Sequence, residues 1–451
     1  MSLAAIRRSI NKKCFSIVLI SLLAIGLWFL GIWEGRLSMS TIEEIRKKEE
    51  EKPTQNPVNK TTQTELAITE RKPSEKITLS RAEQEELEIR LKKATAQKII
   101  LVWISGFGAK VTATVDPKVC GNCIVTQDRN LLNDEKTGAI VLHFDALRPD
   151  NVPPTRNPNH LYLFWVMEST IVVGRSFEKV IKFGDELQFN GSYTHRRDAD
   201  IYSPYGNVQS MSETILKGNK MTPKELLGMK TKLGVAIVSN CASTVGAKKR
   251  VTMLKELISH GVLDGYGGCL GGRNFASGHR RDYRHHEEVK KYKFYFSFEN
   301  SYHCKGYITE KFFDNALSGF AVPVVWGAAK EEYAAIAPPG SFIHAEDFTS
   351  MKELADYIKH LDQNDEEYLE YLKWITMKPS DLPEYGRQTG WCQICRALHG
   401  INVDDIYNPS YDPENPERPL FTDGVAKRMV KPSLTSWFIE SEDPKCFQDL
   451  N

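Results

Sequence analysis

The chain has 451 residues and a formal net charge of +1, and 26% of its residues are charged. This length exceeds that of a typical single domain, so we expect two lobes with accessory segments. The balanced charge argues against nucleic acid as the main partner, because nucleic-acid-binding proteins concentrate positive charge.

The first predicted element is a membrane anchor at residues 14–33, an uncharged apolar run long enough to cross a bilayer. Four basic residues precede it: Arg7, Arg8, Lys12 and Lys13. No acidic residue occurs before Glu34, so residues 1–13 are predicted to stay in the cytosol and the rest to lie across the membrane. A cleaved signal peptide is the alternative, disfavoured by the length of the run and the lack of a small-x-small site.

Residues 34–97 are predicted to form a solvated stem, because they are polar, rich in Lys and Glu and poor in aromatic residues. Within this segment, Ser80 to Lys93 can form a helix. A homodimer through the stem or the membrane segment is left open, since the helix carries few apolar positions for a coiled coil.

The globular part begins at Lys98 with a buried-type strand, IILVWIS. Apolar strands alternate with helical patterns from there on, which predicts an α/β fold with parallel sheets. The expected strands are 140–144, 161–167, 234–239, 294–298 and 321–326, and the expected helices are 248–260, 309–317 and stretches of 351–377. A polar hinge at 217–232 divides the chain into lobes at 98–225 and 226–400, and residues 401–451 are expected to pack on their surface.

Residues 293–327, KFYFSFENSYHCKGYITEKFFDNALSGFAVPVVWG, form the most informative stretch. It reads as strand, polar turn, helix and strand, and ligands of such units bind at the carboxyl ends of the strands. A nucleobase can stack on Tyr307, hydroxyls can bind Asn300 and the two glutamates Glu299 and Glu310, and Lys311 with the helix dipole can face a diphosphate. These groups suit a nucleotide-sugar. The plainer alternative is an ordinary turn whose Glu–Lys pair caps a helix.

The FEN turn, followed by Y-I-T-E-K and a V-P-V-V strand, resembles the donor-binding signature of the α1,3-fucosyltransferases, glycosyltransferase family 10. The resemblance implies two facing doubly wound lobes of the GT-B type, with 98–225 on the acceptor side and 226–400 binding the donor. It also implies a type II Golgi membrane enzyme with a luminal catalytic domain. The expected reaction is inverting transfer of fucose from GDP-fucose, without an essential divalent metal, to a GlcNAc of glycoprotein glycans in α1,3 linkage. The N-glycan core GlcNAc is the first acceptor expected, and outer-chain LacNAc, giving Lewis-type products, is the alternative.

The same resemblance assigns roles to individual residues. Glu168-Ser169-Thr170 is similar to the family's E-S-P element, whose glutamate is the general base, with Thr170 in place of the proline. Asp145 and Asp198 are weaker candidates for the base. Arg250 and Lys311 would stabilise the leaving diphosphate, although Lys248 or Lys249 could replace Arg250. The remaining donor-binding residues are Asn300, Tyr307 and Glu310.

Residues 192–206, SYTHRRDADIYSPYG, are similar to another family element but contain an inserted Thr194-His195. Arg196 or Arg197 is expected to help close the cleft. Asp198 and Asp200 also spell D-x-D, which leaves a metal-dependent transferase of another nucleotide-sugar as a second hypothesis. A catalytically inactive lectin-like or scaffold protein is the third.

Eight of the nine cysteines follow the predicted anchor, and an even number in an oxidising compartment fits disulfides. The two C-x-x-C pairs could instead hold one zinc ion. The family resemblance implies that Cys120 and Cys123 pair with Cys392 and Cys395. A bond between Cys241 and Cys269 is also expected, since both follow neighbouring strands. Two sequons are candidate glycosylation sites, Asn59 and Asn190.

Overall fold

The computed structural model describes residues 78–208, 211, 221–271, 287–411, 419–421 and 433–448. The predicted anchor, residues 34–77 of the predicted stem and the Asn59 sequon lie outside these residues. Within the described ranges, none of the helices is both long and apolar enough to span a membrane.

The first sheet has six parallel strands in the order β2-β1-β3-β4-β5-β6. The strands are β1 (Lys98–Ile104), β2 (Cys123–Thr126), β3 (Thr137–His143), β4 (Leu161–Val166), β5 (Gly191–Thr194) and β6 (Ile201–Tyr202). The predicted strands at β1, β3 and β4 are confirmed. Their continuous apolar runs are explained by burial on both faces of the sheet.

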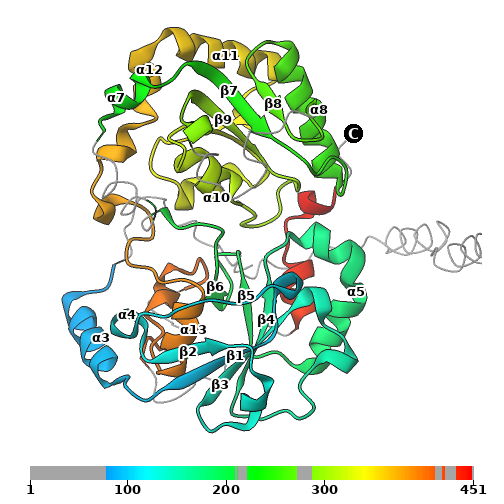
Figure 1. Ribbon diagram of the computed structural model, residues 1–451, viewed down its shortest axis with the longest axis vertical. Coiled ribbons are helices and arrows are strands. Elements are labelled where there is room, and N and C mark those ends of the chain that lie inside the picture. Colours follow the sequence, from blue (N-terminus) through cyan, green and yellow to red (C-terminus); the bar gives the residue numbers. More distant parts are fainter. Residues whose placement is uncertain are drawn as a thin grey trace, which may run out of the picture. The chain divides into compact units, whose positions relative to one another are not determined.

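Helices from distant parts of the chain cover the two faces of this sheet (Figure 1). Helix α5 (Thr170–Leu187) packs on the face that includes Leu101 and Phe164. Helix α13 (Trp391–Leu398) packs on the opposite face, which includes Val141. The chain therefore returns to its first sheet after completing the second one.

Two further helices flank the first sheet, α3 (Arg81–Lys93) and α4 (Pro117–Cys120). The predicted helix at Ser80–Lys93 is confirmed as α3, and Ser80 and Glu83 form a reciprocal capping box at its start. The residue after it, Ala94, accepts a hydrogen bond from the backbone N–H of Asn122. The end of the predicted stem is thus tied to the first sheet.

The second sheet has five parallel strands in the order β11-β10-β9-β7-β8. The strands are β7 (Lys232–Ile237), β8 (Asp264–Tyr266), β9 (Tyr292–Phe298), β10 (Val322–Trp326) and β11 (Ile343–His344). The helices are α7 (Pro223–Gly228), α8 (Val245–Ser259), α10 (Lys330–Ile336), α11 (Met351–Gln363) and α12 (Asp365–Glu370). Two parallel sheets covered by helices confirm the predicted α/β class.

Two predicted helices differ in detail from the structure. Helix α8 begins before Lys248 because Thr244 caps it, its side chain accepting a hydrogen bond from the N–H of Ala247. The helix expected at 309–317 is instead a π-helix, η5 (Lys311–Leu317). Such a turn is uncommon and is often found at functional sites.

Residues 433–448 form the C-terminal segment, which contains η10 (Thr435–Glu440) and η11 (Pro444–Phe447). Leu434, Trp437 and Phe438 are buried in the same apolar cluster as α5 and the first sheet. The Asp185 carboxylate accepts hydrogen bonds from the backbone N–H of Leu434 and the hydroxyl of Thr435.

Four disulfides link the described cysteines. The predicted pairing of the two C-x-x-C motifs is confirmed, and so is the Cys241–Cys269 bond. The zinc alternative is wrong: His399 lies beside Cys123 and Cys395, but these two cysteines are bonded to each other. The fourth disulfide, Cys304–Cys446, was not predicted.

Candidate active site

The signature turn, residues 299–311, is organised around a buried carboxylate. Glu299 follows β9 and is fully buried. It accepts hydrogen bonds from the N–H of Thr309 at 2.9 Å, the Thr309 hydroxyl at 2.8 Å and Lys311 Nζ at 2.9 Å. The prediction that Glu299 binds a ligand hydroxyl is therefore wrong, because its oxygens point into the turn and hold it in shape.

The N-terminus of α8 packs directly on this turn. The Thr244 hydroxyl donates to the carbonyl of Asn300. A Cβ added at Gly246 would lie 2.8 Å from that carbonyl oxygen, so only glycine permits the close approach. Asn300 itself is partly exposed at the end of β9. The amide of Asn300 and the positive end of the α8 dipole thus lie at the same edge of the second sheet.

Lys311 and Glu310 differ in how far they are buried in the turn and bonded to it. The side chain of Lys311 is 16% exposed, and Nζ also donates to the Thr309 hydroxyl at 2.8 Å. The Glu310 side chain is 49% exposed and lies 3.3 Å from Lys311 Nζ. Burial opposes ionisation of Glu310, but the neighbouring Lys311 ammonium and hydrogen bonds lower its pKa below the ordinary value. Glu310 can therefore accept hydrogen bonds as a carboxylate.

Arg250 is buried rather than exposed on the face of α8. Its guanidinium donates to the backbone carbonyls of Phe298 and Asn240, both at 2.9 Å. Its Nε has no hydrogen-bond partner among the residues that the structure describes. Of the other two candidate cations, Lys248 is exposed and Lys249 is partly buried. The Arg250 guanidinium is therefore not exposed to a ligand, since both of its terminal nitrogens bind backbone carbonyls. Direct contact of Arg250 with a diphosphate stays a prediction.

Glu168 lies at the carboxyl end of β4 and meets the signature turn. The phenol of Tyr307 donates to Glu168 Oε2 over 3.3 Å. Desolvation raises the pKa of Glu168 above its ordinary value, and the Tyr307 hydrogen bond and Lys311 oppose this shift. A carboxylate with a raised pKa can hold a proton taken from a substrate.

Tyr307 does not present an open ring face. It is 4% exposed, and its ring packs edge-on with His195 at 5.3 Å and Tyr205 at 6.1 Å between centroids. Burial lowers the pKa of His195 to about 3, so this inserted histidine is a neutral packing residue. The predicted stacking of a nucleobase on Tyr307 is at odds with this packing, which leaves the phenol directed at Glu168.

The alternative carboxylates have structural partners. Asp145 lies 2.6 Å from His143 Nδ1 and accepts the backbone N–H of Phe107. Asp198 binds the Arg196 guanidinium at 2.9 and 2.6 Å. Asp200 accepts the N–H and hydroxyl of Ser192 at 2.8 and 2.9 Å. Their carboxylate oxygens therefore already serve the fold.

The two arginines proposed to close the cleft also hold structure together. Arg196 is 1% exposed, lies over the Trp437 ring and donates to its carbonyl, which fixes the C-terminal segment. Arg197 pairs with Glu384 at 2.8 Å. Their role in closure stays a prediction.

Asn190, the sequon within the described ranges, is partly buried, and its side-chain oxygen accepts the backbone N–H of Tyr162. Glycosylation there stays a prediction.

Sequence reasoning missed two residues that hold the signature turn from outside. Glu332 of α10 accepts the N–H of Gly306 at 2.7 Å, and Glu442 accepts the N–H of Lys305 at 2.8 Å. No local pattern marks either one. Cys304 did carry a signal, because it lies inside the signature turn and is left over with Cys446 once the other six cysteines are paired.

Two family models match the chain. Residues 95–206 match "Fucosyltransferase, N-terminal", and residues 227–409 match the C-terminal part of "Glycosyltransferase family 10 (fucosyltransferase)".

Relatives with similar sequences are also named fucosyltransferases. Glycoprotein 3-alpha-L-fucosyltransferase A of Drosophila melanogaster is 32% identical over 290 residues, which cover 64% of this chain and 52% of the relative. 4-galactosyl-N-acetylglucosaminide 3-alpha-L-fucosyltransferase FUT5 of Hylobates lar is 32% identical over 317 residues, or 68% of this chain and 77% of the relative. A crystal structure of an alpha1,3-fucosyltransferase aligns with 72% of this chain and 96% of its own, at 16% identity and a TM-score of 0.37. From the matched models and the extent of the sequence identity, the chain belongs to glycosyltransferase family 10, the fucosyltransferases.

Proposed function

We propose that this glycosyltransferase moves fucose from GDP-fucose to a GlcNAc of glycoprotein glycans, in α1,3 linkage and with inversion at C1. The observation that carries the proposal is the contact between Glu168 and Tyr307. It brings a half-buried carboxylate from the first sheet against the signature turn of the second. Membership of the family supports GDP-fucose as the donor.

In the proposed reaction, Glu168 takes the proton of the acceptor hydroxyl as the hydroxyl oxygen attacks C1 of fucose. The bond from C1 to the diphosphate oxygen breaks, and its electron pair leaves with GDP. Burial favours this role, since the raised pKa of Glu168 makes it a stronger base than an exposed glutamate. Negative charge develops on the leaving group and needs fixed positive groups nearby.

We place the donor at the carboxyl edge of the second sheet, between the N-terminus of α8 and the signature turn. The α8 dipole and Lys311 would face the diphosphate, while Asn300 and Glu310 would bind hydroxyls. Tyr307 would orient Glu168 beside the fucose. Arg250 would act from behind the turn, holding the carbonyls of Phe298 and Asn240 and adding positive potential. Lys248 and Lys249 remain candidates for direct contact.

The two parallel sheets support a GT-B arrangement. We expect no essential divalent metal, because Asp198 and Asp200 are occupied by Arg196 and Ser192. The metal-dependent alternative predicts that EDTA abolishes activity and Mn²⁺ restores it, whereas full activity in EDTA contradicts it.

For the acceptor, we propose the N-glycan core GlcNAc first. The name of the Drosophila relative, a glycoprotein fucosyltransferase, is consistent with this choice. The name of the Hylobates lar relative points to 4-galactosyl-N-acetylglucosaminide, so outer-chain LacNAc is the second candidate.

We also propose that residues 14–33 anchor the enzyme in the Golgi membrane as a single-pass type II protein. The disulfides support a catalytic part in an oxidising lumen. Protease treatment of sealed microsomes should leave the catalytic part intact, and degradation without detergent would contradict this topology. Endoglycosidase treatment should increase the electrophoretic mobility of the glycosylated wild type. A smaller increase in the Asn59→Gln or Asn190→Gln variant would show that the substituted sequon carries a glycan.

The central test is incubation of the detergent-solubilised full chain with GDP-fucose and two acceptors, a core N-glycopeptide and a LacNAc-terminated glycan. Mass spectrometry with linkage analysis should find fucose α1,3-linked to the core GlcNAc. Transfer to LacNAc alone would select the second acceptor, and transfer to neither would contradict the proposed function. The third hypothesis, a catalytically inactive lectin-like or scaffold protein, predicts that the Glu168→Gln variant keeps the biological activity of the wild type.

A further inference from the structure

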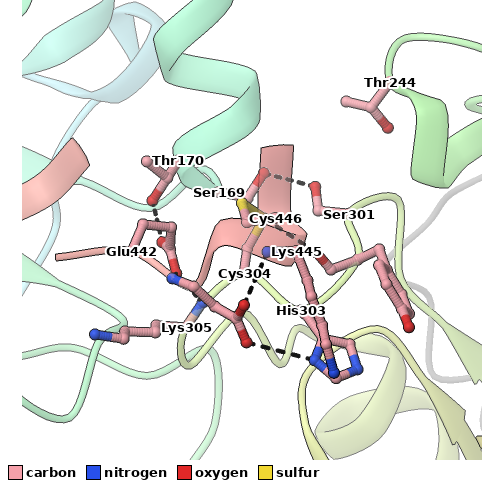
Figure 2. Close-up of a disulfide and its surroundings, with 12 residues drawn as sticks. Ser169, Thr170, Thr244, Ser301, His303, Cys304, Lys305, Glu442, Lys445 and Cys446 are labelled. Atoms are coloured by element: carbon pink, nitrogen blue, oxygen red, sulfur yellow. Dashed lines mark hydrogen bonds and ion pairs between the residues drawn. A yellow bond between two sulfur atoms is a disulfide. The ribbon is translucent and has the colours of Figure 1, made fainter. Parts of the chain in front are cut away.

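A buried carboxylate in the C-terminal segment joins the two halves of the candidate active site (Figure 2). Glu442 is 5% exposed. One of its oxygens accepts the hydroxyl of Thr170 at 2.5 Å, and the other accepts the N–H of Lys305 at 2.8 Å. Thr170 lies two residues after Glu168, and Lys305 lies two residues before Tyr307. Glu442 thus spans the same gap as the Tyr307–Glu168 hydrogen bond.

Contacts of the C-terminal segment around Glu442 also fix the position of this residue. The Cys304–Cys446 disulfide bonds the C-terminal segment to the residue just before Lys305. Lys305 Nζ donates to the carbonyl of Ser441. The N–H of Asp443 donates to Glu442 at 2.9 Å. Figure 2 shows Glu442 between Thr170 and Lys305, next to the Cys304–Cys446 disulfide. These contacts hold the carboxylate in place.

Two neighbouring contacts tighten the same junction. The hydroxyls of Ser169 and Ser301 lie 2.6 Å apart and form a direct hydrogen bond between residues 168–170, here called the Glu168 loop, and the signature turn. Glu332 accepts the N–H of Gly306, so two consecutive amides of the turn each bind a carboxylate from another segment. Burial, with Glu442 nearby, raises the pKa of Glu332 to about 7.

Anchoring the C-terminal segment does not require a buried carboxylate. Trp437 and Phe438 already pack on α5, and Arg196 binds the segment through its backbone and through Ser441. Burying a carboxylate carries a large desolvation cost unless its oxygens are satisfied. The donors that satisfy Glu442 include the Thr170 hydroxyl, at the start of α5 next to Glu168, and the Lys305 N–H of the signature turn. The reaction requires these two parts of the chain to be held together.

We propose that Glu442 is a positioning residue for fucosyl transfer: it sets the distance between Glu168 and the signature turn. The inference rests on the proposed function. Glu442 touches neither the base nor the donor, so its loss should impair the chemical step more than donor binding. A misplacement of about 1 Å can reduce a rate by about 100-fold.

The experiment compares four variants of the detergent-solubilised full chain, with GDP-fucose and the best acceptor. Glu442→Ala should lower kcat by about 10- to 100-fold and change the KM for GDP-fucose and the Kd for GDP by less than about 3-fold. Glu442→Gln should recover most of the rate, because its amide oxygen accepts the Lys305 N–H and its NH₂ can donate to Thr170. Thr170→Val should also lower kcat, because it removes the Thr170–Glu442 hydrogen bond that Glu442→Ala removes as well. Glu440→Gln, an exposed site in the same segment with the same change of charge, should behave as wild type.

Wild-type kcat in both Glu442→Ala and Thr170→Val would overturn the inference. A parallel loss of kcat, GDP binding and thermal stability in Glu442→Ala would also overturn it, since that is the result of a merely structural role. If Glu442→Ala does not fold, Thr170→Val decides by the same criterion. Absence of transfer by the wild type would contradict the proposed function instead.

Discussion

The signature turn and the Glu168 loop reach similar order by different means. In the turn, Glu299, Thr309 and Lys311 bind one another, so the polar contacts close within a short stretch of chain. In the Glu168 loop, the partners come from far along the sequence: Tyr307 for Glu168, Ser301 for Ser169 and Glu442 for Thr170. The polar core of the turn is therefore local, although Glu332 and Glu442 also hold the turn from outside, whereas these partners of the Glu168 loop all come from distant segments.

The largest effect is expected at the base. Glu168→Gln should lower kcat by about 10²–10⁴-fold, because the amide cannot accept a proton from the acceptor. The Kd for GDP should stay within about 3-fold of wild type, since the turn retains its own contacts. Steady-state rates and calorimetry measure the two quantities. The Asp145→Asn variant is the control, and a similar loss of rate there would make Asp145 the better candidate.

Removal of the Glu299–Lys311 ion pair should test the signature turn. Lys311→Ala leaves Glu299 as an uncompensated buried carboxylate, so the free energy of unfolding should fall by about 3–5 kcal/mol. Donor use should fall as well. Denaturant unfolding measures the stability, and Lys248→Ala, an exposed cation on α8, should leave it unchanged. Equal stability in the two variants would show that the Glu299–Lys311 pair does not hold the turn.

The unpredicted disulfide should separate stability from rate. The double variant Cys304→Ser/Cys446→Ser should lose about 2–4 kcal/mol of stability, because the unfolded chain is no longer cross-linked. It should also lower kcat, since Glu442 loses its anchor. Cys120→Ser/Cys392→Ser provides the matched control beside the first sheet, with a similar loss of stability and an unchanged kcat. If both double variants lower kcat equally, the Cys304–Cys446 disulfide has no special role in placing Glu442 for the reaction.

A smaller effect is expected at Tyr307. Its hydrogen bond lowers the pKa of Glu168, although desolvation raises that pKa overall. Tyr307→Phe should therefore raise the pKa further and move the acidic limb of the pH–rate profile to higher pH. The profile of kcat/KM measures this shift. An unchanged limb would mean that the Tyr307–Glu168 contact is absent in the working enzyme.

The same contrast explains what could be predicted from the sequence. Strands β9 and β10, the signature turn and Glu168 are marked by local patterns. Two of the four disulfides follow from the family resemblance, and a third follows from the position of Cys241 and Cys269 after neighbouring strands. The inward direction of Glu299, the burial of Arg250 and the packing of Tyr307 depend on distances between segments. Glu442 carries no local signal at all, because its partners lie in two other loops.

The π-helix η5 illustrates a further limit. The apolar spacing of residues 311–317 suits any helix, so it cannot distinguish a π-helix from an α-helix. Likewise, the D-x-D spelling of Asp198 and Asp200 does not reveal that Arg196 and Ser192 bind their carboxylates. Such partners become visible only once the strands are placed.

The most direct test of Glu168 as the base is the pH dependence of fucosyl transfer by the wild type and by Glu168→Gln. Since the base must be ionised, kcat/KM of the wild type should rise with pH through a midpoint above the ordinary glutamate pKa of 4.5, as expected from the desolvation of Glu168. The residual activity of Glu168→Gln should lack this limb. If Glu168→Gln retains both the limb and the wild-type rate, another group takes the proton and the proposed mechanism is wrong.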